Sequence, residues 1–245
     1  MAKLVPHGFK QCVVIMAYDP TVGCNIPCVW ALLTGKDQKL YKYLLSELSI
    51  LLDDRWMPRY CICDFEKGLL NAIRCKFPET IIRGCYFHFR QALDRMMNKY
   101  KISNDERAIC NNQLEFLTLV SERHILPKNK FNRLKMERIL ELFEKTWMKR
   151  FPSDLWNTSS IDHKSMKART NNCLERYNRG INEQFTNPHP NIQQFIDVLK
   201  KEESYYASLC RNIRSGALKR ELVPCVEKRN ISEELIAYLQ EFNPE

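Results

Sequence analysis

Three side chains that can bind metals or transfer protons, Asp64, Cys85 and His88, stand where predicted strands give way to predicted helices. Asp64 follows the short apolar run 60–63, and a helical pattern of apolar residues begins directly after it. A second apolar run, 80–86, contains Cys85, and His88 follows the run at the start of another helical pattern. The carboxyl ends of parallel strands face solvent at one edge of a sheet, where ligands usually bind. We therefore expect these polar groups at a ligand-binding edge.

Other roles stay open for these residues. Asp64 could instead cap a helix that begins at Glu66, since Asp is a favoured N-cap residue. Cys85 and His88 have the C-x₂-H spacing of half a zinc site, but the sequence offers no second half at a suitable spacing. A packing or hydrogen-bonding role for Cys85 and His88 is therefore favoured, and zinc is not expected as a cofactor.

The first hundred residues alternate between strands and helices. Strands are predicted at 10–18, 26–34, 60–63 and 80–86, and helical patterns at 40–53, 66–77 and 88–96. A short turn containing Gly23 joins the first two strands and predicts an antiparallel hairpin. The order β-β-α-β-α-β-α indicates an α/β fold, a mixed sheet with helices on its faces. Before the first full strand the chain offers only a fragment, 3–6.

Helical periodicity dominates the rest of the chain. Two helices are predicted between Ser103 and Trp147, separated by a stop at Pro127. The loop 151–168 follows, and further helices are predicted to begin near 169, 192 and 232. Several large aromatic residues are interpreted as core anchors rather than base-stacking platforms, namely Trp30, Trp147, Phe151 and Trp156.

Composition indicates a globular, basic protein. With 44% apolar residues and only 7 glycines, we interpret the 245-residue chain as a single domain with an insertion. The longest apolar runs, 12–18 and 28–33, are far shorter than the ~20 residues of a membrane span, and the first residues lack the apolar segment of a secretory signal. We therefore expect an intracellular protein whose 11 cysteines are thiols. The net charge of +9 and the pI near 9.0 suggest a polyanionic partner.

Four separated blocks resemble the transposase domain of Mutator-like elements, the MULE domain. They are CDFEKGLLNAIRCKFP, GCYFHFRQAL, RTNNCLERYNRGIN and NPHPNIQQFI, and their order and spacing also match, so the resemblance covers nearly the whole chain. The family implies an α/β fold with an RNase H-like mixed sheet, helices on both faces, and an all-helical insertion before the third acid. The implied parts are a core at 1–100 with an incomplete first strand, a helical insertion and loop at 101–168, and C-terminal helices at 169–245 that complete the core.

The resemblance also implies a chemistry. Three acids of the family bind two divalent ions, Mg²⁺ or Mn²⁺, and drive DNA strand cleavage and transfer in DNA transposition. On that analogy Asp64 is the second acid and Glu175 the third. An isolated glutamate on a helix is usually a solvated charge, but the motif residues around Glu175 favour the site position. The family motif residues are Cys85, His88, Thr170, Asn171 and Asn172. The resemblance also implies that the protein binds DNA, forms a homo-oligomer and is located in the nucleus. Membrane binding is not expected.

The first acid of the family has no counterpart in this sequence. The resemblance places it just upstream of residue 3, and no Asp or Glu precedes Asp19. Asp19 closes a strand that would run antiparallel to the first, and Asp37 lies in a loop, so neither is expected to replace it. A site with two of its three acids lacks a bridging ligand. We therefore expect an N-terminally truncated domain of a DDE-type transposase that is inactive as written.

Two further functions stay open. The chain could be a domesticated or relic domain that binds DNA or a protein partner without catalysis, or a zinc-stabilised interaction module. It carries no upstream DNA-recognition module, so recognition of specific terminal repeats is not expected. Five basic side chains surround Glu175, and we favour contact with the DNA backbone over a merely solvated face. They are Lys164, Lys167, Arg169, Arg176 and Arg179.

Overall fold

The computed structural model describes residues 5–103, 107, 118, 143–157 and 172–219. The chain divides into two compact units. The hairpin unit comprises residues 1–59, 66–80 and 171–224, and the strand-pair unit comprises residues 60–65, 81–170 and 225–245. Within the described residues, each unit contains one two-stranded sheet.

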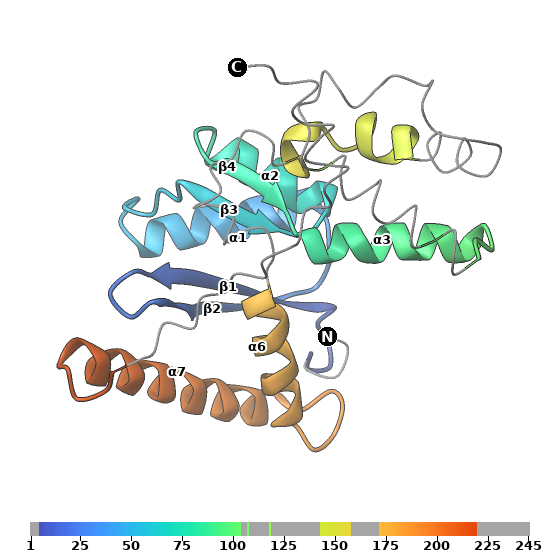
Figure 1. The fold of residues 1–245 in the computed structure, drawn as a ribbon. Coiled ribbons are helices and arrows are strands. Elements are labelled where there is room, and N and C mark those ends of the chain that lie inside the picture. The colour runs from blue at the N-terminus through green and yellow to red at the C-terminus, as the bar shows by residue number, and fades with distance from the viewer. Residues whose placement is uncertain (1–4, 104–106, 108–117, 119–142, 158–171, 220–245) are drawn as a thin grey trace. The chain divides into compact units, whose positions relative to one another are not determined.

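Strands β1 (Gln11–Asp19) and β2 (Cys24–Leu33) pair antiparallel and confirm the predicted hairpin (Figure 1). Asp19 stands opposite Cys24 at the turn. Gly23 adopts the left-handed conformation with φ 69°, and its N–H donates to the Asp19 carbonyl at 2.8 Å. A residue with a side chain would be strained there, so the glycine helps to fix the register of the two strands.

Helix α1 (Gln38–Leu51) begins after its N-cap residue Asp37, whose Oδ1 accepts a backbone hydrogen bond at 3.0 Å. Helix α2 (Lys67–Lys76) packs against α1. Gly68 permits the close approach, because a Cβ at this position would lie only 3.1 Å from the backbone nitrogen of Gln38. Both helices lie where the apolar periodicity predicts them.

The hydroxyl of Tyr41, a side chain only 1% exposed, links β1 and α1 to the start of α2. It donates to Oε1 of Glu66 at 2.6 Å, and Nε2 of Gln11 donates to the same hydroxyl at 2.8 Å. Glu66 is the N-cap residue of α2, but its side chain makes no capping hydrogen bond. Its carboxylate is held by Tyr41 instead.

Helices α6 (Asn172–Glu183) and α7 (Ile192–Arg214) complete the hairpin unit (Figure 1). Asn191 opens α7 with a capping box. Trp30 of β2 packs against the core, and its Nε1 donates to the hydroxyl of Tyr177 at 2.7 Å. Buried side chains of β1, α6 and α7 form that core together with one residue ahead of β1: Val5, Cys12, Val14, Tyr177, Ile181 and Phe195.

In the strand-pair unit, β3 (Tyr60–Cys63) and β4 (Ile81–Gly84) pair in parallel. Helix α3 (Tyr86–Lys99) follows β4 after a single residue. A short π-helical segment, η2 (Glu144–Met148), and a 3₁₀ turn, η3 (Ser153–Leu155), belong to the same unit. The parallel pairing brings the carboxyl ends of β3 and β4 to the same edge of the sheet.

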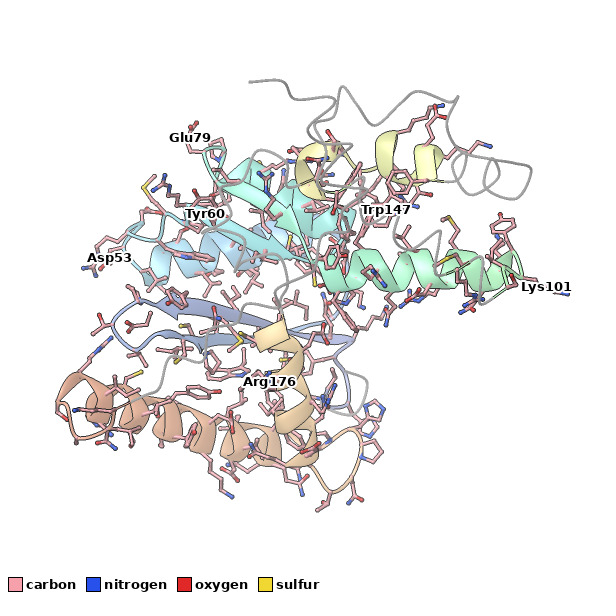
Figure 2. All side chains as sticks on the ribbon, viewed as in Figure 1. Asp53, Tyr60, Glu79, Lys101, Trp147 and Arg176 are labelled. Carbon is pink, nitrogen blue, oxygen red and sulfur yellow. The ribbon has the colours of Figure 1, made fainter. Side chains whose placement is uncertain are left out.

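Aromatic side chains form the core of the strand-pair unit. Phe89 of α3 meets Trp147 edge to face, with ring centroids 4.6 Å apart, and stacks on Trp156 at 5.9 Å. Nε1 of Trp156 donates to the carbonyl of Trp147 at 2.7 Å (Figure 2 labels Trp147). Both indoles are 3% exposed, and Phe151 is 6% exposed, which confirms their predicted role as core anchors.

The described residues confirm the mixed α/β class. β4 is shorter than the predicted run 80–86, because Cys85 takes the extended N-cap conformation and α3 begins directly after it. The strands pair two by two within the described residues, so the single mixed sheet of an RNase H-like fold stays a prediction. Of the two helices predicted between 103 and 147, the end of the second lies in the described range, where η2 (Glu144–Met148) is found, and nearly all of the rest lies outside it. The helix predicted from 232 lies wholly outside the described residues. None of the helices described has the length and apolarity of a membrane span.

Candidate functional site

Asp64 lies directly after β3, at the edge where β3 and β4 both end. The ladder between the strands extends by one bond, since the Cys85 N–H donates to the Cys63 carbonyl at 2.8 Å. Asp64 and Cys85 therefore follow neighbouring strand ends. The Asp64 side chain is 48% exposed, so a ligand can reach its carboxylate from solvent.

His88 lies in the first turn of α3, and its imidazole approaches Asp64. Nδ1 of His88 lies 3.1 Å from Oδ1 of Asp64. Because helical side chains lean toward the helix N-terminus, a histidine in the first turn is directed back to the strand ends. Cys85 is the N-cap residue of α3 and is fully buried. The C-x₂-H spacing thus places a buried thiol and a partly exposed imidazole beside the acid.

The N-cap of α2 is Glu66, so Asp64 stands two positions ahead of the capping position. Asp64 belongs to the strand-pair unit and α2 to the hairpin unit. The alternative role of Asp64 as a helix cap is therefore not what the structure describes. Phe65 and Glu66 instead separate the acid at the end of β3 from Lys67, the first residue of α2.

Phe65 anchors the backbone next to Asp64. Its ring covers Gly84 so closely that a Cβ on Gly84 would overlap the ring. The ring also meets Trp147 and Phe151 edge to face, with centroids 4.7 and 5.2 Å apart. Sequence reasoning missed Phe65, and the signal that could have found it is an aromatic residue directly after a strand-end acid.

Three cysteines lie close together near the acid: Cys61 and Cys63 on β3, and Cys85 after β4. The thiol of Cys61, through a hydrogen bond, and burial both hold the pKa of Cys63 well above its usual range, and the charges of Asp64 and Cys85 act in the same direction. Cys63 therefore stays a neutral thiol at neutral pH and behaves as a small apolar residue. All nine cysteines in the described part of the chain are free thiols, as expected.

Glu175 lies in the first turn of α6 and is partly buried. Leu174 and Tyr177 beside it pack into the core of the hairpin unit, which fixes the face that α6 turns inward. Arg176 (labelled in Figure 2) and Arg179 are exposed. Asn172 is the first residue of α6. The other predicted residues around Glu175 lie outside the described residues: Lys164, Lys167, Arg169, Thr170 and Asn171.

Two asparagines on α6 were missed by sequence reasoning. Asn178 is 5% exposed, and within the described residues its Oδ1 is a buried acceptor without a donor. Asn182 donates through Nδ2 to the backbone carbonyl of Asn178, and its own Oδ1 is likewise buried without a donor in the described part of the chain. Both follow Glu175 at helical spacing, which is the signal that could have found them.

Asp19 and Asp37, the other acids near the start of the chain, serve local structure. Oδ1 of Asp19 accepts backbone hydrogen bonds from Thr21 at 2.8 Å and Val22 at 3.1 Å. The bond from Val22, and after it the Arg214 guanidinium, hold the pKa of Asp19 below its usual value. Asp37 caps α1. Each of these two carboxylates is engaged by its own turn or helix.

The two candidate metal ligands belong to different units, Asp64 to the strand-pair unit and Glu175 to the hairpin unit. Each is therefore described within its own unit. No group of three or more His, Cys, Asp or Glu residues in the described ranges could hold a metal ion. Both acids offer carboxylate oxygens as metal ligands. The side chain of Asp64 is half-exposed, and Glu175 is partly buried.

Part of the chain matches a known protein family. Residues 10–92 match the MULE transposase domain family. This range runs from β1 into α3, and it contains Asp64, Cys85 and His88, whereas Glu175 lies beyond it. No curated protein matched the chain. The match confirms the resemblance over these residues and implies a transposase-derived protein.

Proposed function

We propose that this chain, with its match to the MULE transposase domain at residues 10–92, keeps the second and third acids of a metal-dependent DNA strand-transfer site. Asp64 and Glu175 would be these acids, and Mg²⁺ or Mn²⁺ the ion that they hold. One observation carries the proposal. The half-exposed carboxylate of Asp64 lies at the shared end of two parallel strands, 3.1 Å from His88 and inside the matched range.

The residues suit a hard divalent cation. Carboxylate oxygens are the ligands that Mg²⁺ and Mn²⁺ prefer. When bound, the ion stabilises negative charge on the attacking and leaving oxygens of a phosphodiester. His88 and Phe65 would hold the Asp64 carboxylate in one orientation, since one approaches the carboxylate and the other packs the adjoining backbone.

DNA is the proposed partner, bound through its phosphates. Arg176 and Arg179 are exposed on α6, at the start and the end of the helical turn that follows Glu175. Arginine contacts to phosphates give sequence-independent affinity and hold the duplex near the acids. Lys164, Lys167 and Arg169 would extend this basic surface. A nuclear location and a homo-oligomeric assembly are part of the same proposal.

A second function is favoured by the exposed arginines, which need no metal to bind DNA. In this alternative the chain is a domesticated or relic domain that binds DNA or a protein partner without catalysis. The two functions differ in whether Asp64 and Glu175 take up a cation. Metal binding is therefore the measurement that separates them.

The test titrates the purified chain with Mn²⁺ and compares Asp64→Asn and Glu175→Gln with the wild type. Each substitution removes a charged oxygen ligand and nearly preserves the shape of the side chain. We expect each to weaken Mn²⁺ binding at least tenfold, about the effect that even indirect partners of a metal have. Asp197→Asn and Glu203→Gln, which change exposed carboxylates on α7, should bind Mn²⁺ as the wild type does.

Wild-type Mn²⁺ affinity in both acid variants would contradict the proposed site. DNA binding without any uptake of Mn²⁺ would favour the alternative function. Plasmid nicking in Mg²⁺ completes the test. Nicking that is abolished by Asp64→Asn would establish catalysis and overturn the inactivity expected from the sequence.

A further inference from the structure

We propose that Asn178 is a positioning residue of the metal site, whose side-chain carbonyl oxygen accepts a hydrogen bond from a water of the cation that Glu175 would hold. This inference rests on the proposed function, and it adds a residue to which the MULE resemblance gives no role. Asn178 stands on α6, one helical turn after Glu175.

The first argument is burial without a partner. Only 5% of Asn178 is exposed, and its Oδ1 finds no hydrogen-bond donor among the described residues. A buried acceptor without a donor destabilises a protein, and native structures seldom retain one. A water or a bound group is the kind of donor that can satisfy such an acceptor.

Asn182 repeats the arrangement one turn later. Its Nδ2 donates to the backbone carbonyl of Asn178, which fixes the orientation of the Asn182 amide. Its Oδ1 is then directed away from that carbonyl, and it is also buried without a donor in the described part of the chain. Two neutral oxygen acceptors therefore stand in succession on the same helix.

The spacing relates both amides to Glu175. Glu175, Asn178 and Asn182 stand at i, i+3 and i+7, so they share one flank of α6. Tyr177 and Ile181 belong to the buried core, and the polar flank therefore adjoins the apolar face. Because helical side chains lean toward the N-terminus, the Asn178 amide is directed toward the turn that carries Glu175.

The chemistry of a hard cation accounts for these acceptors. Mg²⁺ keeps several of its waters when carboxylates bind it, and these waters are strong hydrogen-bond donors. Amide oxygens accept such bonds without adding negative charge to the site. Groups that orient the direct ligands and waters of a metal change its affinity by about 10–100-fold.

The experiment combines metal affinity with stability in the absence of metal. Asn178→Leu keeps the branched shape of the side chain but removes the oxygen, and Asn178→Asp keeps an oxygen acceptor. Asn182→Leu tests the second amide. Asn212→Leu, at an exposed position of α7, is the matched control. For each variant, Mn²⁺ binding is titrated, and the melting temperature is measured in EDTA.

We expect Asn178→Leu to raise the melting temperature in EDTA by about 2–4 °C, because it removes a buried acceptor that has no donor in the metal-free protein. The same variant should bind Mn²⁺ about tenfold more weakly than the wild type. Asn178→Asp should lower the melting temperature in EDTA and keep the wild-type affinity or exceed it. Asn182→Leu should follow Asn178→Leu, and the control should change neither quantity.

A lower melting temperature of Asn178→Leu in EDTA would overturn the inference, since the oxygen would then have a structural donor. So would wild-type Mn²⁺ affinity in Asn178→Leu, or an equal loss of affinity in Asn178→Asp. If Asn178→Leu does not fold, the inference is tested by the Mn²⁺ affinities of the other two variants. It then requires wild-type or higher affinity in Asn178→Asp and weaker binding in Asn182→Leu, and any other result overturns it. When the inference fails but Asp64→Asn and Glu175→Gln still lose Mn²⁺, the proposed function stands. If the wild type binds no Mn²⁺, both fail.

Discussion

Cys12 on β1 shows how burial alone changes the chemistry of a residue. The side chain is 3% exposed within the core of the hairpin unit, and burial raises the pKa of its thiol to about 12. A thiolate is poorly solvated in such a core. In the unfolded chain the same thiol titrates near its ordinary value of about 8.5. As the pH rises from about 9 to 12, the unfolded chain releases a proton that the folded chain keeps, so folding stability falls.

We predict that Cys12→Val makes folding less sensitive to alkali. Between pH 9 and 11, the wild type should lose up to about 1.4 kcal/mol of unfolding free energy per pH unit more than the variant does, because valine has no proton to release. Urea unfolding at several pH values measures the difference. Cys173→Val, which replaces an exposed thiol, is the control and should keep the wild-type slope. Parallel slopes for the wild type and Cys12→Val would refute the argument.

Residue types and spacing were sufficient to select Asp64, Cys85 and His88, because an acid after an apolar run and a C-x₂-H pair are visible in one dimension. The 3.1 Å approach of His88 to Asp64 follows from the place of these residues at two neighbouring strand ends. Phe65 and Asn178 could not be selected in this way. Phe65 was singled out because its ring leaves no room for a Cβ on Gly84, and Asn178 because its buried Oδ1 has no hydrogen-bond donor among the described residues. Both features arise only when the chain is folded.

At the scale of elements, Gly84 at the end of β4 is a position where the strand lies directly against an aromatic ring of the core. The Phe65 ring lies directly on it, so a methyl group there must displace the ring or the strand. Trp147 and Phe151 surround the ring and restrict its movement. Because Asp64 adjoins Phe65, strain at Gly84 would also be transmitted to the acid.

We predict that Gly84→Ala lowers the unfolding free energy by about 1–3 kcal/mol, the usual effect of overpacking a core. The double variant Gly84→Ala/Phe65→Leu should lose less than the sum of the single variants, since the smaller side chain relieves the overlap. Chemical denaturation measures all three. Gly180→Ala on α6, where nothing lies within 4 Å of the new methyl group, should instead stabilise the protein slightly. Additive losses in the double variant would show that Phe65 is not the obstacle.

Apolar periodicity predicted the hairpin, α1, α2 and the start of α7 well, because each of these elements buries apolar side chains, and the hairpin, α1 and α7 also carry local turn or capping signals. Asp37 and Asn191 are examples of such signals. The end of β4 was placed too far along the chain, since residues 85 and 86 are as apolar as a strand but already belong to the cap and first turn of α3. The pairing of the four strands into one sheet or two depends on long-range contacts that periodicity does not encode.

For the whole molecule, Asp64 and Glu175 are assigned to one site by the family resemblance, while the structure describes them in separate units. The matched range ends at residue 92, so it includes Asp64 and not Glu175. Local sequence patterns place each acid on its element. They do not contain the distance between two elements that are far apart in the chain.

The net charge of +9 would attract DNA to the whole molecule, and each arginine that contacts a phosphate in the proposed complex would contribute by a known amount. Each phosphate contact releases condensed counterions, so the logarithm of the binding constant falls linearly with the logarithm of the salt concentration. We predict that Arg176→Ala and Arg179→Ala each reduce this slope by about one. The loss of affinity should be the same for duplexes of unrelated sequence, because phosphates carry no sequence information.

Fluorescence anisotropy with two unrelated duplexes at several salt concentrations measures these slopes. Arg55→Ala is the control, since Arg55 is also exposed but pairs with Asp53 at 3.0 Å and lies far along the chain from α6. It should leave the slope close to the wild-type value. If all three variants lower the slope equally, the charge acts through the overall field of the protein and α6 is not the DNA-contacting element. A loss confined to the two α6 variants would place the duplex against the helix that carries Glu175, where a strand-cleaving site requires it.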